Sequence, residues 1–242
     1  MMNSVGIIGF GRFGRVLGQI LSDDFKVKAF DIKQQEPQFG VEFVNLETIL
    51  QEKIIFISVP IRDLKNVIMD IAPNLQKGTT VLDVCSVKVY PVTVMTEALP
   101  SHVGIIATHP LFGPDSITIP NGHKIIMHRT RDVYNQFDFW KDYFASKAFE
   151  AIEMSPEEHD KLAAYSQGVT HFIGRILKET GITSTEIDTV GFRTLLDVID
   201  QTCNDSWQLF CDLENYNPYS LRMMENLENS IEKVRAQILR RN

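Results

Sequence analysis

Two short segments of the chain carry side chains that can perform chemistry together. His109 lies in the run Thr-His-Pro-Leu-Phe-Gly-Pro, and Ser86 lies upstream in the run Asp-Val-Cys-Ser-Val-Lys. A neutral imidazole, with a pKa of about 6.5 when unperturbed, suits a general base near neutral pH. A serine beside such a histidine also suggests a hydrolase nucleophile. The chain has no Gly-x-Ser-x-Gly elbow, which argues against that class.

A glycine-rich segment near the amino terminus predicts a dinucleotide site. It follows the apolar run 5–10 and opens the helical pattern 12–21. The first glycine permits a tight turn, the second lets the backbone approach a diphosphate, and the third lets helix and strand pack closely. N–H groups at the helix start attract the phosphates. The predicted cofactor residues of this segment are Gly9, Phe10, Gly11, Arg12, Phe13 and Gly14.

Asp31 sets the expected choice of cofactor. It closes the second apolar run, 22 residues after Gly9, where a carboxylate can accept hydrogen bonds from the adenosine ribose hydroxyls. Because a carboxylate repels a 2′-phosphate, Asp31 favours NAD, whereas the nearby cation Lys33 leaves NADP open. Another strand is expected to end in a ligand-contacting loop, with a plain proline turn as the alternative. That loop is formed by Ser58, Val59 and Pro60.

Apolar runs alternate with helical patterns over the first 154 residues. The runs cover residues 5–10, 26–30, 54–59, 80–84, 103–107 and 124–127. Helical patterns at 63–71 and 89–99 separate several of them. Such alternation predicts crossover connections and a largely parallel sheet covered on both faces. We therefore predict an α/β fold with a Rossmann-type dinucleotide-binding domain over residues 1–154, in which His109 sits in a rigid Pro/Gly loop after its strand.

Residues 155–242 read as helical throughout. Ser155 can cap a helix whose first residue is Pro156, and Gly181 and Pro218 are the obvious breaks, which suggests about three helices. Apolar side chains recur at spacings of three and four in the last stretch, at Leu221, Met224, Leu227, Ile231, Val234 and Ile238. About 90 residues of helix form a thin core. We predict an all-helical substrate and dimerisation domain that packs against a second copy of the chain.

Composition excludes several functional classes. The formal net charge of −7 argues against a general affinity for nucleic acid or anionic membranes. No apolar run approaches the roughly 18–20 residues of a membrane-spanning helix, and the first residues lack the pattern of a secretory signal. Three cysteines without CxxC spacing imply neither a disulfide framework nor zinc, and no other metal spacing is present. We expect a soluble cytoplasmic protein without a metal.

The helical half has a polar face of its own. Gln167, His171 and Arg175 recur at four-residue spacing, which places them on one face of a helix. From this spacing alone His171 is either a ligand contact or a hydrogen-bonded core histidine, and the second interpretation is favoured. Gln167 shares whichever environment His171 has.

Across nearly its whole length the chain resembles the prephenate and arogenate dehydrogenases of tyrosine biosynthesis. The matching segments, in the right order, are GFGRFG, DVCSVK, THPLFGPD, EMSPEEHDKLAAYSQGVTHFIGR and GFRTLLDVIDQTCNDSWQLFCDLENYN. The last one looks most like the plant-type arogenate branch. The resemblance implies that His109 accepts the proton of the substrate ring hydroxyl and that Ser86 hydrogen-bonds both His109 and that hydroxyl.

The resemblance also implies which residues bind the substrate. His171 falls on a substrate-side histidine, which reverses the preference for a core role and makes its neighbour Gln167 a substrate contact too. Many bacterial relatives carry a carboxylate-binding arginine four residues beyond Arg193. Asp197 occupies that position here, so Arg193 or Lys88 is expected to substitute. Asp205 matches an acid of plant-type arogenate enzymes that can pair with an ammonium group; a solvated helix acid is the alternative.

The implied activity is oxidative decarboxylation of prephenate or arogenate with NAD or NADP, giving 4-hydroxyphenylpyruvate or tyrosine. Two other interpretations stay open. A small β-hydroxyacid or imine reductase shares the dinucleotide half and a helical partner, but it would not require Ser86 and His109 together. A non-catalytic NAD-binding regulator would keep the fold without needing Ser86, His109 and His171 intact.

Overall fold

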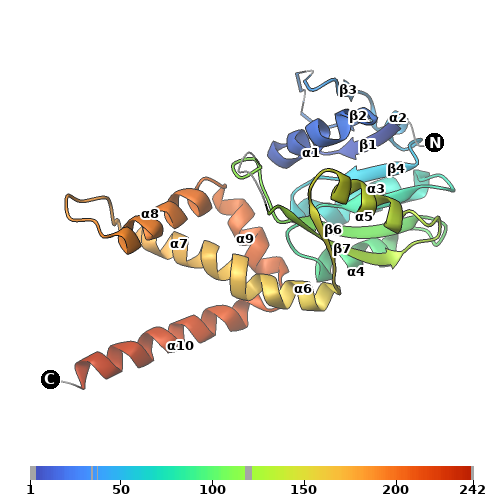
Figure 1. Cartoon of the computed structure of the whole chain (residues 1–242). Helices are drawn as coiled ribbons and strands as arrows, with labels where there is room; N and C mark the ends of the chain where they lie inside the picture. The colour runs from blue at the N-terminus through green and yellow to red at the C-terminus, as the bar shows by residue number, and fades with distance from the viewer. Residues whose placement is uncertain (1–3, 34, 37, 118–121, 241–242) are drawn as a thin grey trace. The chain divides into compact units, whose positions relative to one another are not determined.

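The chain divides into two compact units. The computed structural model describes residues 4–33, 35–36, 38–117 and 122–240. We call Met1–Pro156 the α/β unit and Glu157–Asn242 the helical unit. The α/β unit holds the strands, and the described part of the helical unit contains helices and their connections only (Figure 1). Each unit is described separately below.

A single sheet runs through the described part of the α/β unit. Its strands are β1 Ser4–Ile8, β2 Lys26–Phe30, β3 Glu42–Phe43, β4 Ile54–Ile57, β5 Thr80–Asp83, β6 Gly104–Pro110, β7 Lys124–Arg131 and β8 Glu150–Glu153. They lie in the order β3-β2-β1-β4-β5-β6-β7-β8. All neighbours pair in parallel except β6 and β7, which are antiparallel. The order of the first six strands is that of dinucleotide-binding sheets, so the predicted fold class is confirmed.

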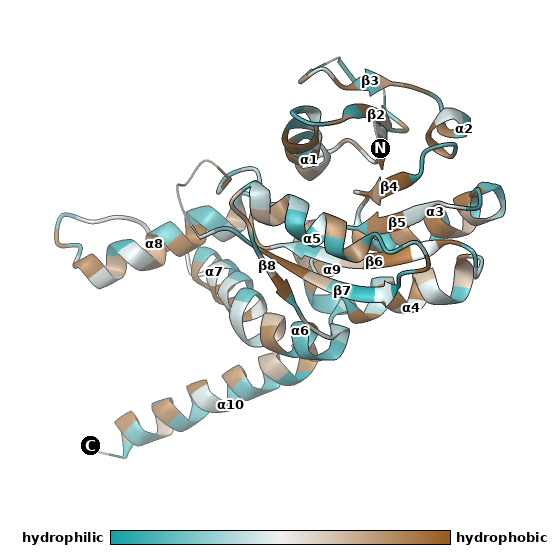
Figure 2. Cartoon of the chain, turned by 45° about the vertical axis from the view of Figure 1, so that its right-hand side comes forward, coloured by the Kyte–Doolittle hydropathy of each residue, from teal (hydrophilic) through white to brown (hydrophobic). Residues whose placement is uncertain are grey.

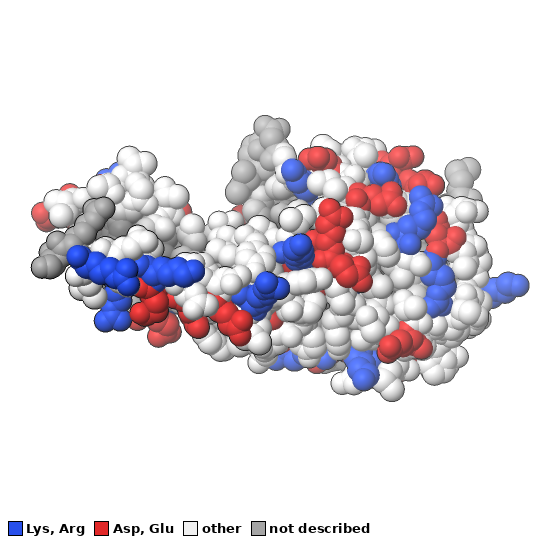
Figure 3. Space-filling model, turned by 90° about the horizontal axis from the view of Figure 1, so that it is seen from below, with Lys and Arg blue, Asp and Glu red and all other residues white. Residues whose placement is uncertain are grey.

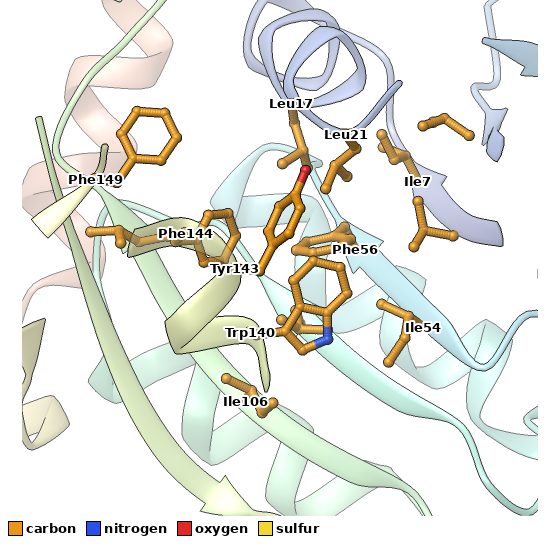
Figure 4. Packing of buried hydrophobic residues seen from close by; sticks show 14 of the residues in the cluster. Ile7, Leu17, Leu21, Ile54, Phe56, Ile106, Trp140, Tyr143, Phe144 and Phe149 are labelled. Atoms are coloured by element: carbon orange, nitrogen blue, oxygen red, sulfur yellow. The ribbon is translucent and has the colours of Figure 1, made fainter. Parts of the chain in front are cut away.

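Helices cover both faces of this sheet. They are α1 Arg12–Ser22, α2 Leu46–Ile49, α3 Leu64–Ile71, α4 Val89–Ala98 and α5 Phe137–Ser146, with 3-10 turns at Ile61–Asp63 and Ala72–Asn74. Leu17 of α1 and Trp140 of α5 pack with Phe56 of β4 on one face (Figure 4). Ile55 and Ile57 point to the opposite face, because side chains alternate along a strand, and both are also fully buried.

Several short elements of the α/β unit escape the sequence analysis. Helix α5 carries aromatic residues at helical spacing, Phe137, Trp140 and Phe144, all buried. Its pattern was detectable, because a spacing of three and four residues indicates one helix face. Strand β8 offers weaker information, since only Ala151 and Ile152 lie between its two terminal glutamates. Pairing with β7 makes this segment a strand.

The helical unit contains more helices than the predicted three. It comprises α6 Pro156–Ala163, a π-helical turn Ala164–Gly168, α7 Val169–Glu179, α8 Val190–Cys203, α9 Trp207–Tyr216 and α10 Ser220–Leu239. Helix α6 begins at Pro156, as predicted. The missed boundaries are marked by N-caps: Thr189 accepts a hydrogen bond from the backbone N–H of Phe192, and Ser206 accepts one from that of Leu209. Such side-chain caps start a helix without any glycine or proline.

The helical unit leaves much apolar surface uncovered. Helix α7 packs closely on α8 at Gly174, where an added Cβ would lie only 2.1 Å from the Thr202 hydroxyl oxygen. Helix α10 buries Met223, but Ile231 and Val234 are 53% and 56% exposed. In Figure 2 apolar bands recur along α10. The predicted apolar stripe exists, and nothing in the described part of this unit covers it.

The surface carries charges of both signs. Figure 3 shows acidic and basic side chains interspersed over the face that it displays. This distribution agrees with the modest net charge of −7. None of the helices within the described ranges is long and apolar enough to cross a membrane.

Candidate active site

The carboxyl ends of the parallel strands gather the predicted catalytic and cofactor segments at one edge of the sheet. Asp83, the last residue of β5, lies opposite Ala107 of β6. Ser86 therefore leaves β5 at the same edge at which His109 sits near the end of β6. The glycine turn follows β1 at this edge as well. Ligands of open α/β sheets bind there.

The glycine turn fits a dinucleotide. Gly9 has a φ of 91°, and an added Cβ would lie 2.3 Å from the Ser58 carbonyl oxygen. A Cβ on Gly14 would lie 2.4 Å from the carbonyl oxygen of Gly9. Gly11, by contrast, has open space where a Cβ would stand, and it caps α1 without any side-chain hydrogen bond. The helix start is thus left accessible to an anion.

Asp31 is hydrogen-bonded to the backbone of the glycine turn. Its Oδ2 accepts a hydrogen bond from the Phe10 backbone N–H at 2.7 Å, and its Oδ1 accepts one from Lys33 N at 2.8 Å. A carboxylate has about four acceptor positions, so ribose hydroxyls can still bind. The Phe10 ring is fully buried and packs edge-on to Phe43. Of the predicted cofactor residues, Phe10 can therefore contribute only its backbone.

The turn also contacts the segment that follows His109. Arg12 forms an exposed ion pair with Asp115 at 2.6 Å, and the Phe13 ring lies 6.0 Å from that of Phe112. Sequence reasoning did not foresee this connection, because the partners are about a hundred residues apart.

The loop after β4 reaches the turn through its first residue. Ser58 N donates to the carbonyl oxygen of Ile8 at 2.7 Å, and its hydroxyl oxygen lies 3.4 Å from where a Cβ on Gly14 would stand. Val59 is half-buried, and an added Cβ on Gly9 would touch it too. Pro60 is exposed and precedes a 3-10 turn. Ser58 and Val59 lie against the glycine turn, and Pro60 acts as the turn proline that was the alternative interpretation.

His109 lies in a strand and is nearly buried. The predicted Pro/Gly loop at this position, after a strand ending at Ala107, is wrong. Strand β6 continues to Pro110, because the antiparallel partner β7 pairs Ile126 with His109. His109 is 3% exposed, whereas Ser86 is half-buried. A strand backbone holds an imidazole more rigidly than a loop does.

Lys88 is placed differently from its predicted role as a substrate ligand. It is 1% exposed, its ammonium pairs with Asp83, and it donates to the Thr108 carbonyl oxygen at 2.6 Å. This placement does not support direct contact with a substrate. The sequence offered a hint, since an acid ending a buried strand needs a partner.

In the helical unit the structure brings His171, Arg175 and Asp205 together. Arg175 donates to the Asp205 carbonyl oxygen at 2.6 Å, and its guanidinium lies 5.5 Å from the ring centroids of Trp207 and Phe210. Burial lowers the pKa of His171, against the opposing charge of Asp205. Burial thus favours the neutral form of His171.

Three buried polar atoms on this face lack a hydrogen-bond partner within the described residues. They are Gln167 Oε1, His171 Nδ1 and Arg175 Nε. Gln167 belongs to the π-helical turn, an irregularity that sequence reasoning missed and that is frequent at functional sites. Buried polar groups without partners are rare in folded proteins, so these atoms are suited to bind a ligand.

Arg193, the other predicted substitute for the missing carboxylate-binding arginine, lies on an exposed part of the helical unit. Arg193 and Asp197 are both exposed on α8. Hydrogen bonds from Ser184 and Thr185 lower the pKa of Asp188, and the charge of Arg193 adds to this effect. The charge of Arg193 thus interacts with Asp188, which lies in the connection between α7 and α8.

Comparison with known proteins places this site in a family. Residues 23–128 match the family model of the prephenate dehydrogenase nucleotide-binding domain, and residues 176–242 match that of the TYRAAT1-like C-terminal domain. Arogenate dehydrogenases 1 and 2 of Arabidopsis thaliana, both chloroplastic, are 32% and 31% identical over 98% of this chain. The chain spans 39% of the length of the first and 70% of the second.

A solved structure shows the same fold. Prephenate dehydrogenase from Aquifex aeolicus, in complex with hydroxyphenyl propionate and NAD+, superposes with a TM-score of 0.78 at 19% identity, covering 99% of this chain and 92% of that one. The sequence identity to the plant enzymes extends through both units. The chain belongs to the prephenate and arogenate dehydrogenase family.

Proposed function

We propose that the protein catalyses the oxidative decarboxylation of prephenate or arogenate with NAD or NADP, giving 4-hydroxyphenylpyruvate or tyrosine. One observation carries this proposal: Ser86, His109 and the glycine turn lie at the same sheet edge, in a chain of this family. A reductase of the same fold would need the glycine turn but neither of the other two residues.

The dinucleotide is held by the glycine turn and Asp31. The open space at Gly11 and the uncapped start of α1 receive the diphosphate, and Asp31 accepts from the adenosine ribose hydroxyls. When bound there, NAD or NADP would supply the hydride acceptor for oxidation of the substrate's carbinol carbon. The carboxylate of Asp31 favours NAD over NADP, because a 2′-phosphate would bring a second negative charge beside it.

His109 is the general base that accepts the proton of the reacting hydroxyl. As the carbinol carbon is oxidised, the neutral imidazole takes this proton, and Ser86 orients both groups. Carbon dioxide then leaves with cleavage of its bond to the ring, and the released electron pair makes the ring aromatic. The resulting phenolate takes the proton back from His109. General-base assistance of this kind typically contributes about 10²–10⁴-fold to the rate.

The helical unit supplies the groups that bind the substrate. Gln167 and His171 offer buried polar atoms without protein partners, and a neutral His171 can donate to or accept from a substrate oxygen. Asp205 is half-buried beside His171, where its carboxylate can pair with the ammonium group of arogenate. Prephenate carries a keto group instead and gains nothing from this acid.

We also propose that the protein forms a homodimer through α10. An apolar groove of about 500 Å³ runs between Ile173 of α7 and the exposed stripe of α10, which supplies Leu227, Ile231, Val234, Ile238 and Leu239. Contiguous exposed apolar surface of this kind marks an association site. A second copy supplies an identical stripe, as symmetric interfaces require.

A direct assay tests the proposed activity. Purified protein is mixed with NAD or NADP and with prephenate or arogenate, and the reduced nicotinamide and the aromatic product are followed together. We expect equal amounts of both. A protein that binds NAD and turns over neither substrate would be the regulator, and one that reduces imines or oxidises β-hydroxyacids would be the reductase. Either result would overturn the proposal.

A further inference from the structure

A buried ion pair lies beneath the catalytic edge of the α/β unit. Asp83 is fully buried and Lys88 is 1% exposed. The Lys88 ammonium binds Asp83 Oδ2. Replacing a buried ion pair by apolar side chains is often neutral or even stabilising, because desolvation of two charges costs as much as their attraction returns. The stability of the fold alone therefore gives little reason for this pair.

Three hydrogen bonds of the pair lie beside the two catalytic residues. Asp83 Oδ2 accepts a hydrogen bond from Cys85 N at 3.0 Å, directly before Ser86. Asp83 Oδ1 accepts one from Thr108 N at 3.3 Å, and Lys88 Nζ donates to the Thr108 carbonyl oxygen at 2.6 Å. Both backbone groups of the residue before His109 are thus held by this pair.

The backbone of the sheet does not provide these contacts. The β5–β6 ladder ends where Asp83 lies opposite Ala107. Beyond this point the chain after β5 leaves the sheet toward Ser86, while β6 continues to His109 and Pro110. Side-chain hydrogen bonds from Asp83 and Lys88 take over where the ladder stops.

We infer that Asp83 and Lys88 are positioning residues, which fix the backbone that carries Ser86 and His109 relative to each other. The inference rests on the proposed dehydrogenase function and replaces the predicted contact of Lys88 with a substrate. Neither side chain touches the substrate in this role. Their loss changes the geometry of proton transfer and leaves the cofactor turn, held by Asp31, as it is.

A double variant separates positioning from stability. Asp83→Asn or Lys88→Met alone leaves the other charge buried without its partner, and each lowers Tm. The double variant Asp83→Asn/Lys88→Met removes both charges, so its Tm returns toward that of the wild type. We expect its kcat to stay roughly 10²-fold low, since a displacement of about 1 Å costs this much. The dissociation constant of NAD should be unchanged.

A second ion pair provides the matched control. Lys28 of β2 pairs with Glu52, which precedes β4, at 2.8 Å, and Glu52 is 8% exposed. This pair lies away from the carboxyl ends of β4 and β5. The double variant Lys28→Met/Glu52→Gln should change Tm and leave kcat as in the wild type.

A spectroscopic measurement makes the test independent of turnover. Histidine-labelled protein gives ring NMR signals for His109, assigned with His109→Asn. These signals should shift in the Asp83→Asn/Lys88→Met variant and stay in place in the control. Wild-type protein that turns over neither substrate contradicts the proposed function, and the NMR comparison then still decides the positioning role. A double variant that does not fold, or that keeps wild-type kcat and His109 signals, overturns the inference.

Discussion

The two units differ sharply in how they bury apolar side chains. Both faces of the sheet in the α/β unit are covered, and its core includes the fully buried Phe56, Phe137 and Trp140. In the described part of the helical unit only a few apolar side chains are buried: Ala163, Ala164, Phe210, Leu213 and Met223. Burial of apolar area is the dominant favourable term in folding. The α/β unit therefore has the larger share of this stabilising burial, whereas the helical unit leaves the stripe of α10 exposed.

This difference also separates two kinds of chemistry. The residue proposed to move a proton, His109, sits on a strand of the well-packed unit. The residues proposed to recognise the substrate, His171 and Asp205, sit in the unit with the exposed apolar stripe.

The largest effect should come from the base. We expect His109→Asn to lower kcat by about 10²–10⁴-fold, because the proton loses its acceptor, and to leave NAD binding and Tm nearly unchanged. His171→Asn should instead raise KM for the substrate with a smaller change in kcat. Steady-state kinetics and calorimetric titration with NAD measure both, and His102→Asn, an exposed site in the same unit, is the control. Near-wild-type kcat for His109→Asn would falsify the assignment of the base.

The next effect concerns the apolar stripe of the helical unit. Ile231→Glu places a charge on the proposed dimer face, so we expect monomers and a lower Tm for the helical transition. Wild-type Tm should rise with protein concentration, since a 100-fold excess over the dissociation constant stabilises by about 2.7 kcal/mol. Analytical ultracentrifugation and calorimetry check this, with Glu228→Gln, an exposed acid outside the apolar stripe of α10, as the control. A wild-type protein that is monomeric at high concentration contradicts the dimer.

A smaller effect should distinguish the two substrates. Asp205→Asn removes the carboxylate proposed to pair with the ammonium of arogenate, and a charge-assisted hydrogen bond is worth about 1.5–3 kcal/mol. We expect kcat/KM for arogenate to fall roughly tenfold relative to that for prephenate. An unchanged ratio of the two values means that Asp205, which lies in the bend between α8 and α9 rather than in a helix, has no role in substrate choice.

The smallest effect is a pH dependence within the helical unit. Glu214 is 6% exposed next to the π-helical turn, and burial raises its pKa, with Ser220 opposing. A raised pKa means that the folded state prefers the neutral acid. The stability that protonated Glu214 contributes is complete below the unfolded pKa near 4.5 and is lost as the pH rises through the folded pKa.

Glu214→Gln should therefore be more stable than wild type at neutral pH, by about 1–3 kcal/mol, and not at pH 4. Thermal melts across pH measure this, and the exposed Glu225→Gln serves as control. Parallel profiles for Glu214→Gln and wild type would show that burial of Glu214 carries no such cost.

The sequence predicts best where local chemistry decides the structure. The glycine turn, the acid Asp31 and the start of α6 at Pro156 each follow from a few adjacent residues. The errors occur where distant partners decide. His109 belongs to a strand because β7 pairs with it, and Lys88 is buried because Asp83 and Thr108 bind it. The extra helices begin at Thr189 and Ser206, whose caps are ordinary residues in any loop.

The two hydrogen bonds of Asp31 bear on any attempt to redesign cofactor choice. Replacing this acid would remove a charge that repels a 2′-phosphate, but the same carboxylate accepts the hydrogen bonds of Phe10 N and Lys33 N. Removing it would loosen the turn that receives the diphosphate. The choice between NAD and NADP and the affinity for the dinucleotide would therefore change together. Engineering toward NADP should therefore keep Asp31 and begin with Arg15, whose guanidinium donates a hydrogen bond to Gln35 Oε1 at 3.0 Å.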